Sequence, residues 1–248
     1  MTSPELTPYD ITRYGRQILL FGEESQRKLK GAHIFVAGAG GLGSPLCTYL
    51  AVAGIGHLHI VDFDVVDWSN LNRQILHWDK DVGHLKVQSA VEKLHQMNPS
   101  IKVRISQIKI DETNVESLVG DADGIADCMD NFPTRYLLNR TAIRKRIPFF
   151  HGAIYGMEAR VSTFIPGETA CLRCLFPEVP PPSSPFPVIG ATPGIAATIQ
   201  TMEIIKYLTR YGTPLKNRML VFDGEAGSFI ELKLQRDANC QDCGSLNT

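Results

Sequence analysis

A glycine-rich turn between a short apolar segment and a helical pattern constrains this chain more than any other feature of its sequence. Residues 33–36 are typical of a buried strand and run directly into the sequence GAGGLG at 38–43, after which the pattern is helical through Val52. A second apolar strand, 57–61, follows and ends at an acid, Asp62. This order predicts a β-α-β unit, which is the building block of a parallel sheet.

The rest of the chain continues to alternate between strand-like and helix-like segments. Further strands are expected at 101–105, 124–128, 148–152, 158–165, 219–222 and 228–234, and further helices at 86–97, 111–119, 132–146 and 196–208. The β-branched residues of 158–165 favour an antiparallel extension of the sheet. The sequence therefore predicts an α/β fold, a Rossmann-like doubly wound mixed β-sheet with helices on both faces and a C-terminal antiparallel extension.

Length and composition limit the classes of protein to which the chain can belong. A chain of 248 residues with 44% hydrophobic and 21% charged residues can bury the core of one domain, expected here over residues 1–248. The 25 Lys and Arg are balanced by 26 Asp and Glu, so nucleic acid is not an expected partner. With neither a signal-like N-terminus nor a long apolar run in the sequence, we expect a cytoplasmic protein with no membrane association.

The glycine turn carries the first indication of chemistry. Glycines allow a backbone to approach phosphates, and the following helix presents unpaired N–H groups and a positive dipole end to an anion. Asp62, nineteen residues after Gly43, stands where an acid accepts hydrogen bonds from ribose hydroxyls. The alternative is a tight turn with no ligand. Because a dinucleotide and ATP both present a ribose and phosphates, this pattern alone does not distinguish them.

Several further motifs occur in a fixed order from Arg13 to Cys243. They are RYGRQ from Arg13, GAGGLG, VDFD from Val61, SNLNRQ from Ser69, Gly83 with Lys86, DCMDN from Asp127, and finally CLRC and CQDC. In these motifs, which span almost the whole chain, the sequence resembles the ubiquitin-activating-enzyme-like superfamily and its MoeB, ThiF and HesA type of adenylyltransferase.

The resemblance implies an ATP-dependent enzyme that activates the C-terminal glycine carboxylate of a small ubiquitin-like or sulfur-carrier protein ending in Gly-Gly. The product would be an acyl-adenylate, with release of pyrophosphate. The nucleotide half is expected at about 30–155, and the partner-binding and zinc-binding half at about 156–248. The resemblance also implies a homodimer in which Arg16 reaches the site of the other subunit; without the family, Arg16 would be interpreted as a solvated surface charge.

The resemblance assigns individual residues to this chemistry. Arg73 and Lys86 are expected on the triphosphate, and Asp130 is expected to bind Mg²⁺, which prefers carboxylate and phosphate oxygens. The alternative for Asp130 is a cap on the following helix. Together with the glycine pattern, the resemblance predicts ATP-binding residues Gly38, Gly40, Gly41, Gly43, Asp62, Asp64, Ser69, Asn70, Leu71, Asn72, Arg73, Gln74, Lys86, Asp130 and Asn131.

Four of the six cysteines form two C-x-x-C pairs, Cys171 with Cys174 and Cys240 with Cys243. Two such pairs predict a closed, structural zinc site of four thiolates that ties the C-terminal tail to the preceding half. The other two, Cys47 and Cys128, lie within a predicted helix and a predicted strand and are expected to be buried apolar residues.

The segment 177–187 has six prolines in eleven residues, so it is expected to be a crossover loop. Several relatives carry a cysteine in this loop, where this sequence has Ser183 and Ser184. We therefore expect the enzyme to stop at the acyl-adenylate. Three alternatives stay open from the sequence: an NAD-dependent dehydrogenase, a binding module without turnover, and adenylation of a small carboxylic acid. The identity of the partner and its pathway also stay open.

Overall fold

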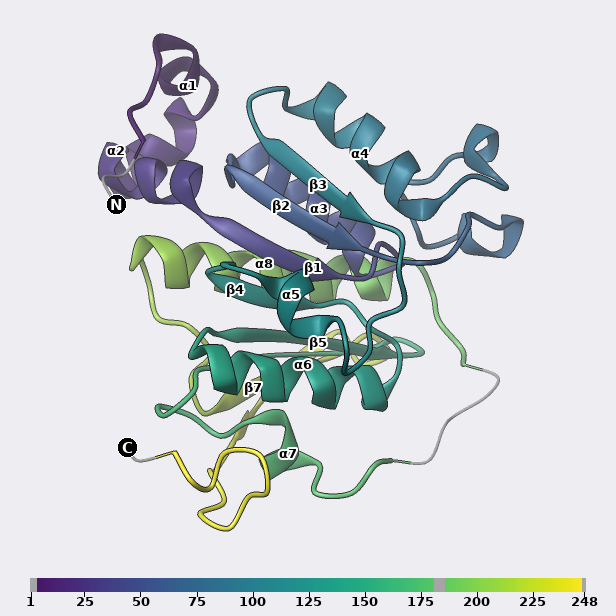
Figure 1. The fold of residues 1–248 in the computed structure, drawn as a ribbon, viewed down its shortest axis with the longest axis vertical. Coiled ribbons are helices and arrows are strands. Elements are labelled where there is room, and N and C mark those ends of the chain that lie inside the picture. Colours follow the sequence, from purple (N-terminus) through teal and green to yellow (C-terminus); the bar gives the residue numbers. More distant parts are fainter. Residues whose placement is uncertain (1–3, 181–185, 247–248) are drawn as a thin grey trace.

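The computed structural model describes residues 4–180 and 186–246 and contains one central sheet. Eight strands lie in the order β3-β2-β1-β4-β5-β6-β7-β8 (Figure 1). Their bounds are β1 His33–Ala37, β2 His57–Val61, β3 Lys102–Ser106, β4 Gly124–Asp127, β5 Phe149–Tyr155, β6 Glu158–Phe164, β7 Arg218–Asp223 and β8 Ser228–Lys233. The first five strands in this order run parallel, and β6, β7 and β8 are added antiparallel. The mixed sheet and its antiparallel extension are therefore confirmed.

Helices cover both faces of the sheet, as the sequence predicts. The helices are α1 Pro8–Arg13, α2 Gly15–Gly31, α3 Gly43–Ala53, α4 Lys86–Met97, α5 Val115–Val119, α6 Phe132–Lys145, α7 Leu172–Leu175 and α8 Ala191–Thr209. One apolar core joins the sheet to α2, α3, α4 and α8, and a second joins it to α5 and α6. Successive residues of β1 alternate between these cores, because strand side chains point to opposite faces in turn.

The predicted strands are all present, with ends that differ by a residue or two except for β5, which continues to Tyr155. Helix α5 begins four residues later than predicted because the Asp111 carboxylate accepts hydrogen bonds from the Thr113 backbone and hydroxyl and forms a turn first. Helix α8 begins five residues earlier than predicted. Pro193 lies in its first turn, where a helix needs no N–H donor.

The N-terminal helices α1 and α2 were missed by the sequence patterns, which predict no element before residue 33. Only Ser25, Gln26 and Leu29 of α2 are buried, and Gly22, with a φ of +80°, kinks the segment into two short helical pieces, so no single long helical pattern runs through it. Both helices lie beside the ends of the strands opposite to the arrowheads (Figure 1). The Gln17 side chain donates to the carbonyl of Ala53, at the C-terminal end of α3.

The strand order reverses between β1 and β4, which is where doubly wound sheets bind ligands. From β1 the chain proceeds outward to β2 and β3, whereas β4 and β5 extend in the other direction. The glycine turn after β1 and the DCMDN segment at the end of β4 are therefore neighbours at the carboxyl edge of the sheet. Gly38 N donates to Val61 O of β2, and Cys128 N donates to Ala37 O of β1.

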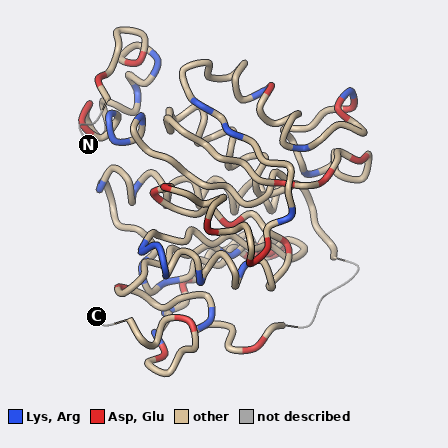
Figure 2. The backbone as a smooth tube through the Cα atoms, in the orientation of Figure 1, with Lys and Arg blue, Asp and Glu red and all other residues tan. Residues whose placement is uncertain are grey.

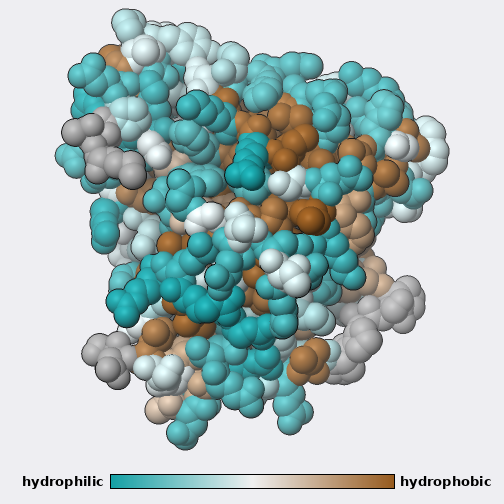
Figure 3. All heavy atoms as spheres, in the orientation of Figure 1, coloured by the Kyte–Doolittle hydropathy of each residue, from teal (hydrophilic) through white to brown (hydrophobic). Residues whose placement is uncertain are grey.

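The surface is mixed in charge and polarity. Basic and acidic residues are interspersed along the path of the chain (Figure 2). Hydrophilic side chains dominate the part of the surface formed by α6, which carries Arg140, Arg144 and Lys145 (Figure 3). Within the part of the chain that the structure describes, none of the helices combines the length and apolar character that crossing a membrane requires.

Candidate functional site at the carboxyl edge of the sheet

Two glycines of the GAGGLG turn are required by the fold itself. A Cβ on Gly43 would lie 2.0 Å from the carbonyl oxygen of Gly38. Gly38 has a φ of +102°, and its Cβ would lie 2.8 Å from the carbonyl oxygen of Cys128. Gly38 is therefore required both for its backbone conformation and for the close approach of β4, and Gly43 is required because the turn closes on itself.

The other two glycines have no such steric requirement within the chain. A Cβ on Gly40 would lie 3.6 Å from Gln74 Nε2, and one on Gly41 would lie 3.5 Å from Pro193, both ordinary contact distances. Helix α3 follows without a side-chain cap or an acidic residue in its first turn. Ser44 N donates to Gly40 O and Pro45 has no N–H, but no backbone partner is present for the N–H groups of residues 40–43 within the described residues. These N–H groups can therefore form an anion site over which a phosphate can approach the backbone.

Asp62 is placed beside this turn, as predicted, but it also organises it. Asp62 Oδ2 accepts from Ala39 N at 2.8 Å, and Oδ1 accepts from Asp64 N at 2.9 Å. Burial raises the pKa of Asp62, and the two backbone N–H groups counter part of that effect. Each carboxylate oxygen retains a second lone pair, so the side chain can still accept from a ribose hydroxyl.

Lys86 and Asp64 form an ion pair at the start of α4. Lys86 Nζ lies 2.8 Å from Asp64 Oδ2, and Lys86 N donates to the backbone oxygen of Asp64. The lysine side chain is only 8% exposed, whereas that of Asp64 is 48% exposed. The Lys86 ammonium is buried, has one half-exposed carboxylate as its partner, and lies at the carboxyl edge of the sheet. A phosphate bound at this edge can therefore form an ion pair with it.

The SNLNRQ segment folds as a compact turn that begins with a short 3-10 helix, η1, at Trp68–Asn70. The Asp67 carboxylate caps it by accepting from the backbone and hydroxyl of Ser69, and these hydrogen bonds lower the pKa of Asp67. Arg73 Nη1 donates to Ser69 O at 2.7 Å and to Asn72 Oδ1 at 3.1 Å. The guanidinium is thus held by its own turn, while Leu71 closes η1 through its N–H to Trp68 O.

Gln74 is the buried member of the segment. It is 4% exposed, and its Oε1 atom is buried without a hydrogen-bond partner within the described residues. Its amide lies beside Gly40 in the glycine turn. An unsatisfied buried acceptor at this position is a group that a bound ligand or water can satisfy.

Asp130 and Asn131 follow β4 with different roles. Asn131 is the N-cap of α6, because its side-chain oxygen accepts from Thr134 N at 2.9 Å. The capping alternative considered for Asp130 is therefore wrong, and the cap is the next residue. Asp130 is exposed, and the described residues include no ion-pair partner for it; its one side-chain contact is Asn131 Nδ2 at 3.4 Å. Its carboxylate is available to a cation.

A buried cluster beneath Asp130 was not predicted from the sequence. Asp127 Oδ1 accepts from Met129 N at 3.1 Å, while Oδ2 lies 2.7 Å from His151 Nδ1. Arg135 Nη2 donates to Met129 O at 2.5 Å, and Arg135 Nε lies 3.3 Å from Asp127 Oδ2 without hydrogen-bond alignment. The Met129 N–H and carbonyl are thus both hydrogen-bonded, to Asp127 and Arg135, and these two bonds fix the loop that carries Asp130.

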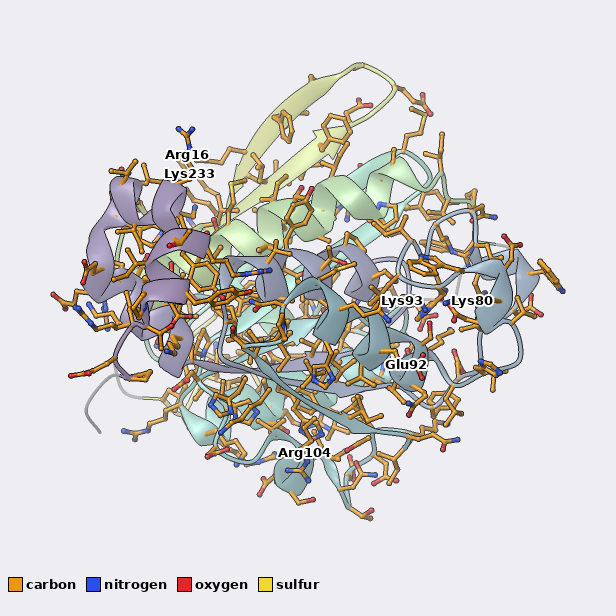
Figure 4. The ribbon with its side chains drawn as sticks, turned by 90° about the horizontal axis from the view of Figure 1, so that it is seen from above. Arg16, Lys80, Glu92, Lys93, Arg104 and Lys233 are labelled. Atoms are coloured by element: carbon orange, nitrogen blue, oxygen red, sulfur yellow. The ribbon has the colours of Figure 1, made fainter. Side chains whose placement is uncertain are left out.

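A second unpredicted cluster supports the glycine turn. His77 Nε2 lies 2.9 Å from Ala39 O, so this nitrogen carries the proton, and Nδ1 accepts from Ser89 Oγ. Lys93 donates to Ser89 Oγ and forms a buried ion pair with Asp81. Burial lowers the pKa of His77 to about 4, so the ring is neutral near pH 7. Figure 4 shows Lys93 extending from α4 toward the segment that carries Lys80.

Arg16 lies away from the other candidates. Figure 4 shows it projecting from α2 into solvent. Its neighbours Arg13 and Gln17 donate to Met97 O and Ala53 O, at the C-terminal ends of α4 and α3. Both helices begin at the carboxyl edge and are 11 or 12 residues long, about 16 Å. The structure therefore places Arg16 near the opposite end of its own chain from the glycine turn.

The four predicted zinc ligands meet at the C-terminal end of the chain. Their sulfur atoms all lie within 4.8 Å of one another, with Cys171 to Cys240 at 3.6 Å and Cys174 to Cys243 at 3.4 Å. Four thiolates at about 2.3 Å from a tetrahedral zinc would be about 3.8 Å apart, so the arrangement fits the ion. Cys47 and Cys128 are buried as predicted, and burial raises the pKa of Cys47 to about 12. Ser183 and Ser184 lie outside the described residues.

The fold and the site together define an α/β protein with a doubly wound sheet and a glycine-rich turn at the switch point of that sheet. The ThiF family matches residues 14–243. The chain is 40% identical over 241 residues to the SAMP-activating enzyme E1 of Haloferax volcanii, covering 94% of this chain and 89% of that protein. It is 37% identical over 250 residues to the sulfur carrier protein adenylyltransferase of Thermus thermophilus, covering 96% and 92%. The chain belongs to the ThiF family and is an adenylyltransferase.

Solved structures show the same fold at lower identity. A crystal structure of E. coli MccB with MccA-N7isoASN superposes with a TM-score of 0.87 at 24% identity, covering 95% of this chain and 75% of that one. At this identity the likeness concerns the fold alone.

Proposed function

We propose that this adenylyltransferase uses ATP to activate the C-terminal carboxylate of a small ubiquitin-like or sulfur-carrier protein ending in Gly-Gly. The names of its relatives in Haloferax volcanii and Thermus thermophilus support this substrate class. One observation carries the proposal. The glycine turn, the Lys86–Asp64 pair, the Arg73 turn and Asp130 all follow strands that end at the carboxyl edge of the sheet, so the same edge carries the glycine turn, two cations and an exposed carboxylate.

The chemistry that these residues must perform is charge neutralisation. A terminal carboxyl has a pKa of about 3.5 and is an anion at neutral pH, so no general base is required. One carboxylate oxygen attacks the α-phosphorus of ATP, the bond to the bridging oxygen breaks, and pyrophosphate leaves with the electron pair. The product is the acyl-adenylate. The glycine-turn N–H groups, Arg73 and Lys86 are assigned to hold the phosphates and the charge that develops on them.

Asp130 is the residue that would hold Mg²⁺, and the ion would neutralise part of the phosphate charge. The exposed carboxylate without an ion-pair partner among the described residues fits this role. Two further predicted nucleotide contacts support the proposal: Asp62 borders the glycine turn, and Gln74, whose amide nitrogen lies beside Gly40, carries a buried oxygen without a partner among the described residues.

Arg16 is assigned to the site of a second subunit in a homodimer. The support is its position, since Arg16 is exposed on α2 and stands near the opposite end of its own chain from the glycine turn. A side chain in that position can contact a triphosphate only in another copy.

The four-cysteine cluster is assigned to a structural zinc ion. Four thiolates complete a tetrahedral site and leave no position open for substrate, so the ion would join residues 171–174 to the C-terminal tail without taking part in adenylation. Because the connection at 177–187 contains no cysteine, we expect the enzyme to release the acyl-adenylate to a separate nucleophile rather than form a thioester with it.

The decisive experiment is exchange of labelled pyrophosphate into ATP with a candidate carrier protein from the same organism. We expect exchange to require Mg²⁺ and the intact carrier. The matched control is the same carrier without its last glycine, which should support no exchange.

Two results would contradict this function. Equal exchange with a small carboxylic acid and no carrier would favour that alternative substrate. Nicotinamide binding without exchange would favour a dehydrogenase. A thiol-sensitive covalent adduct between carrier and enzyme would refute the expectation that the reaction stops at the acyl-adenylate.

A further inference from the structure

Gly190, immediately before α8, lies unusually close to the turn that carries Arg73. A Cβ built on Gly190 would lie 2.2 Å from the carbonyl oxygen of Asn72 and 3.3 Å from Arg73 Cα. The backbone of Gly190 has φ −58° and ψ −27°, which any residue can adopt. The glycine is therefore required by the close contact and not by its conformation.

The same turn is also in contact with the glycine loop. A Cβ on Gly41 would lie 3.5 Å from Pro193, in the first turn of α8, and 3.7 Å from Arg73 Cγ. Arg73 thus lies beside both the start of α8 and the glycine turn. Its guanidinium is hydrogen-bonded to Ser69 and Asn72 of its own turn. The direction of the guanidinium therefore follows the backbone position of this turn.

The segment around Gly190 is itself anchored on its other side. Gly156, between β5 and β6, donates from its N–H to Pro187 O at 2.9 Å and forms a bridge with Val188. Its carbonyl oxygen accepts from Thr192 Oγ1 at 2.9 Å. Residues 187–192 are therefore fixed to the sheet, and a shift forced at position 190 must be taken up largely by the Arg73 turn.

We infer that Gly190 is a positioning residue for adenylation, because its missing side chain lets the start of α8 pack against the backbone of Asn72 and so sets the position of Arg73. This inference rests on the proposed function in one respect, the assignment of Arg73 to the phosphates. The three atoms nearest to a Cβ on Gly190 all belong to the backbone of the turn.

The test is a double-mutant cycle between positions 190 and 73. Gly190→Ala should reduce carrier-dependent pyrophosphate exchange by roughly 100-fold, which is the order of loss that a displacement of about 1 Å produces. Ala191→Ser adds one atom at the exposed neighbouring position and should stay within about two-fold of wild type. In an Arg73→Ala background, Gly190→Ala should have an effect of less than about two-fold, because the group that it displaces is gone.

Two results would overturn the inference. One is wild-type exchange in Gly190→Ala. The other is a double mutant whose loss of exchange equals the product of the losses in Gly190→Ala and Arg73→Ala, which would indicate a general structural role. If Gly190→Ala does not fold, Pro193→Ala instead trims the side chain at the start of α8 that faces Gly41 beside Arg73 Cγ, and adds no clash. It should lower exchange about ten-fold, and again only when Arg73 is present.

Binding of MgATP, measured by calorimetry without carrier, separates this inference from the proposed function. We expect Gly190→Ala to bind at least about ten-fold more weakly than Ala191→Ser. Equal affinity would overturn the inference. If the wild type binds MgATP but no carrier supports exchange, the proposed function fails while the inference is decided by the affinities. If the wild type does not bind MgATP, both are overturned.

Discussion

Replacing Gly40 with alanine tests whether this glycine is needed for ligand binding and not for the fold. The added Cβ would lie 3.6 Å from Gln74 Nε2, an ordinary contact, and Gly40 is not among the residues with positive φ. Alanine at such a position removes conformational freedom from the unfolded chain, so we expect a stability change between zero and a gain of about 1 kcal/mol. The affinity for ATP should nevertheless fall at least about ten-fold, because the methyl group occupies the space of a phosphate.

Gly43→Ala is the matched comparison within the same turn. Its Cβ would lie 2.0 Å from the carbonyl oxygen of Gly38, so the backbone must move by more than an ångström. We expect a loss of about 2 kcal/mol or more in the free energy of unfolding, the range of overpacked cores. Urea denaturation measures this quantity for both variants, and calorimetry with MgATP measures affinity. If Gly40→Ala bound MgATP as tightly as wild type, the assignment of the turn to phosphates would be refuted.

The remaining predictions concern the cations, the thiolates and the buried histidines. Arg73→Ala and Lys86→Ala should each lower the exchange rate by two to three orders of magnitude, about 3 kcal/mol, with unchanged melting temperature; near-wild-type exchange in both would disprove their role. Cys174→Ser should release zinc and lower stability, with activity lost only as the protein unfolds, as checked by metal analysis alongside thermal melting. Burial lowers the pKa of His59 and His77 from 6.5 to about 4, so the unfolded chain binds more protons between these values and stability falls as pH falls through this window. From pH 7 to pH 5 each histidine should cost about 2 kcal/mol in urea denaturation, and a glutamine variant at either position should reduce that loss.

Much of the fold could be predicted because its signals are local. The strand, glycine turn and helix are adjacent along the chain, and their periodicities differ sharply. The parallel and antiparallel parts of the sheet also followed from the alternation of elements. Helices α1 and α2 were missed because α1 is short and α2 is kinked at Gly22, and because polar contacts such as that of Gln17 anchor them.

Part of the site could not be predicted because its contacts are long-range. Asp127 and His151 are 24 residues apart and meet only because β4 and β5 pair in register. Lys93 is one of many charged residues, and its neighbours in the sequence do not show that it is buried and paired with Asp81. Local signals were available for two helix starts: Thr7 and Asp10 form a capping box with Pro8 at the first helical position of α1, and Asp67 caps η1.

The sequence by itself predicted the chemistry. Residue type and short spacing predicted the glycine turn and the four thiolates that can share a zinc, and the ordered motifs of the family predicted the residues for the phosphates and the metal ion. Only the tertiary structure decided which glycines serve the fold and which leave room for a ligand, that Asn131 rather than Asp130 caps α6, and that Gly190 touches the Arg73 turn. Distances across a packed interior depend on how segments far apart in the sequence fit together, so a local sequence pattern cannot predict them.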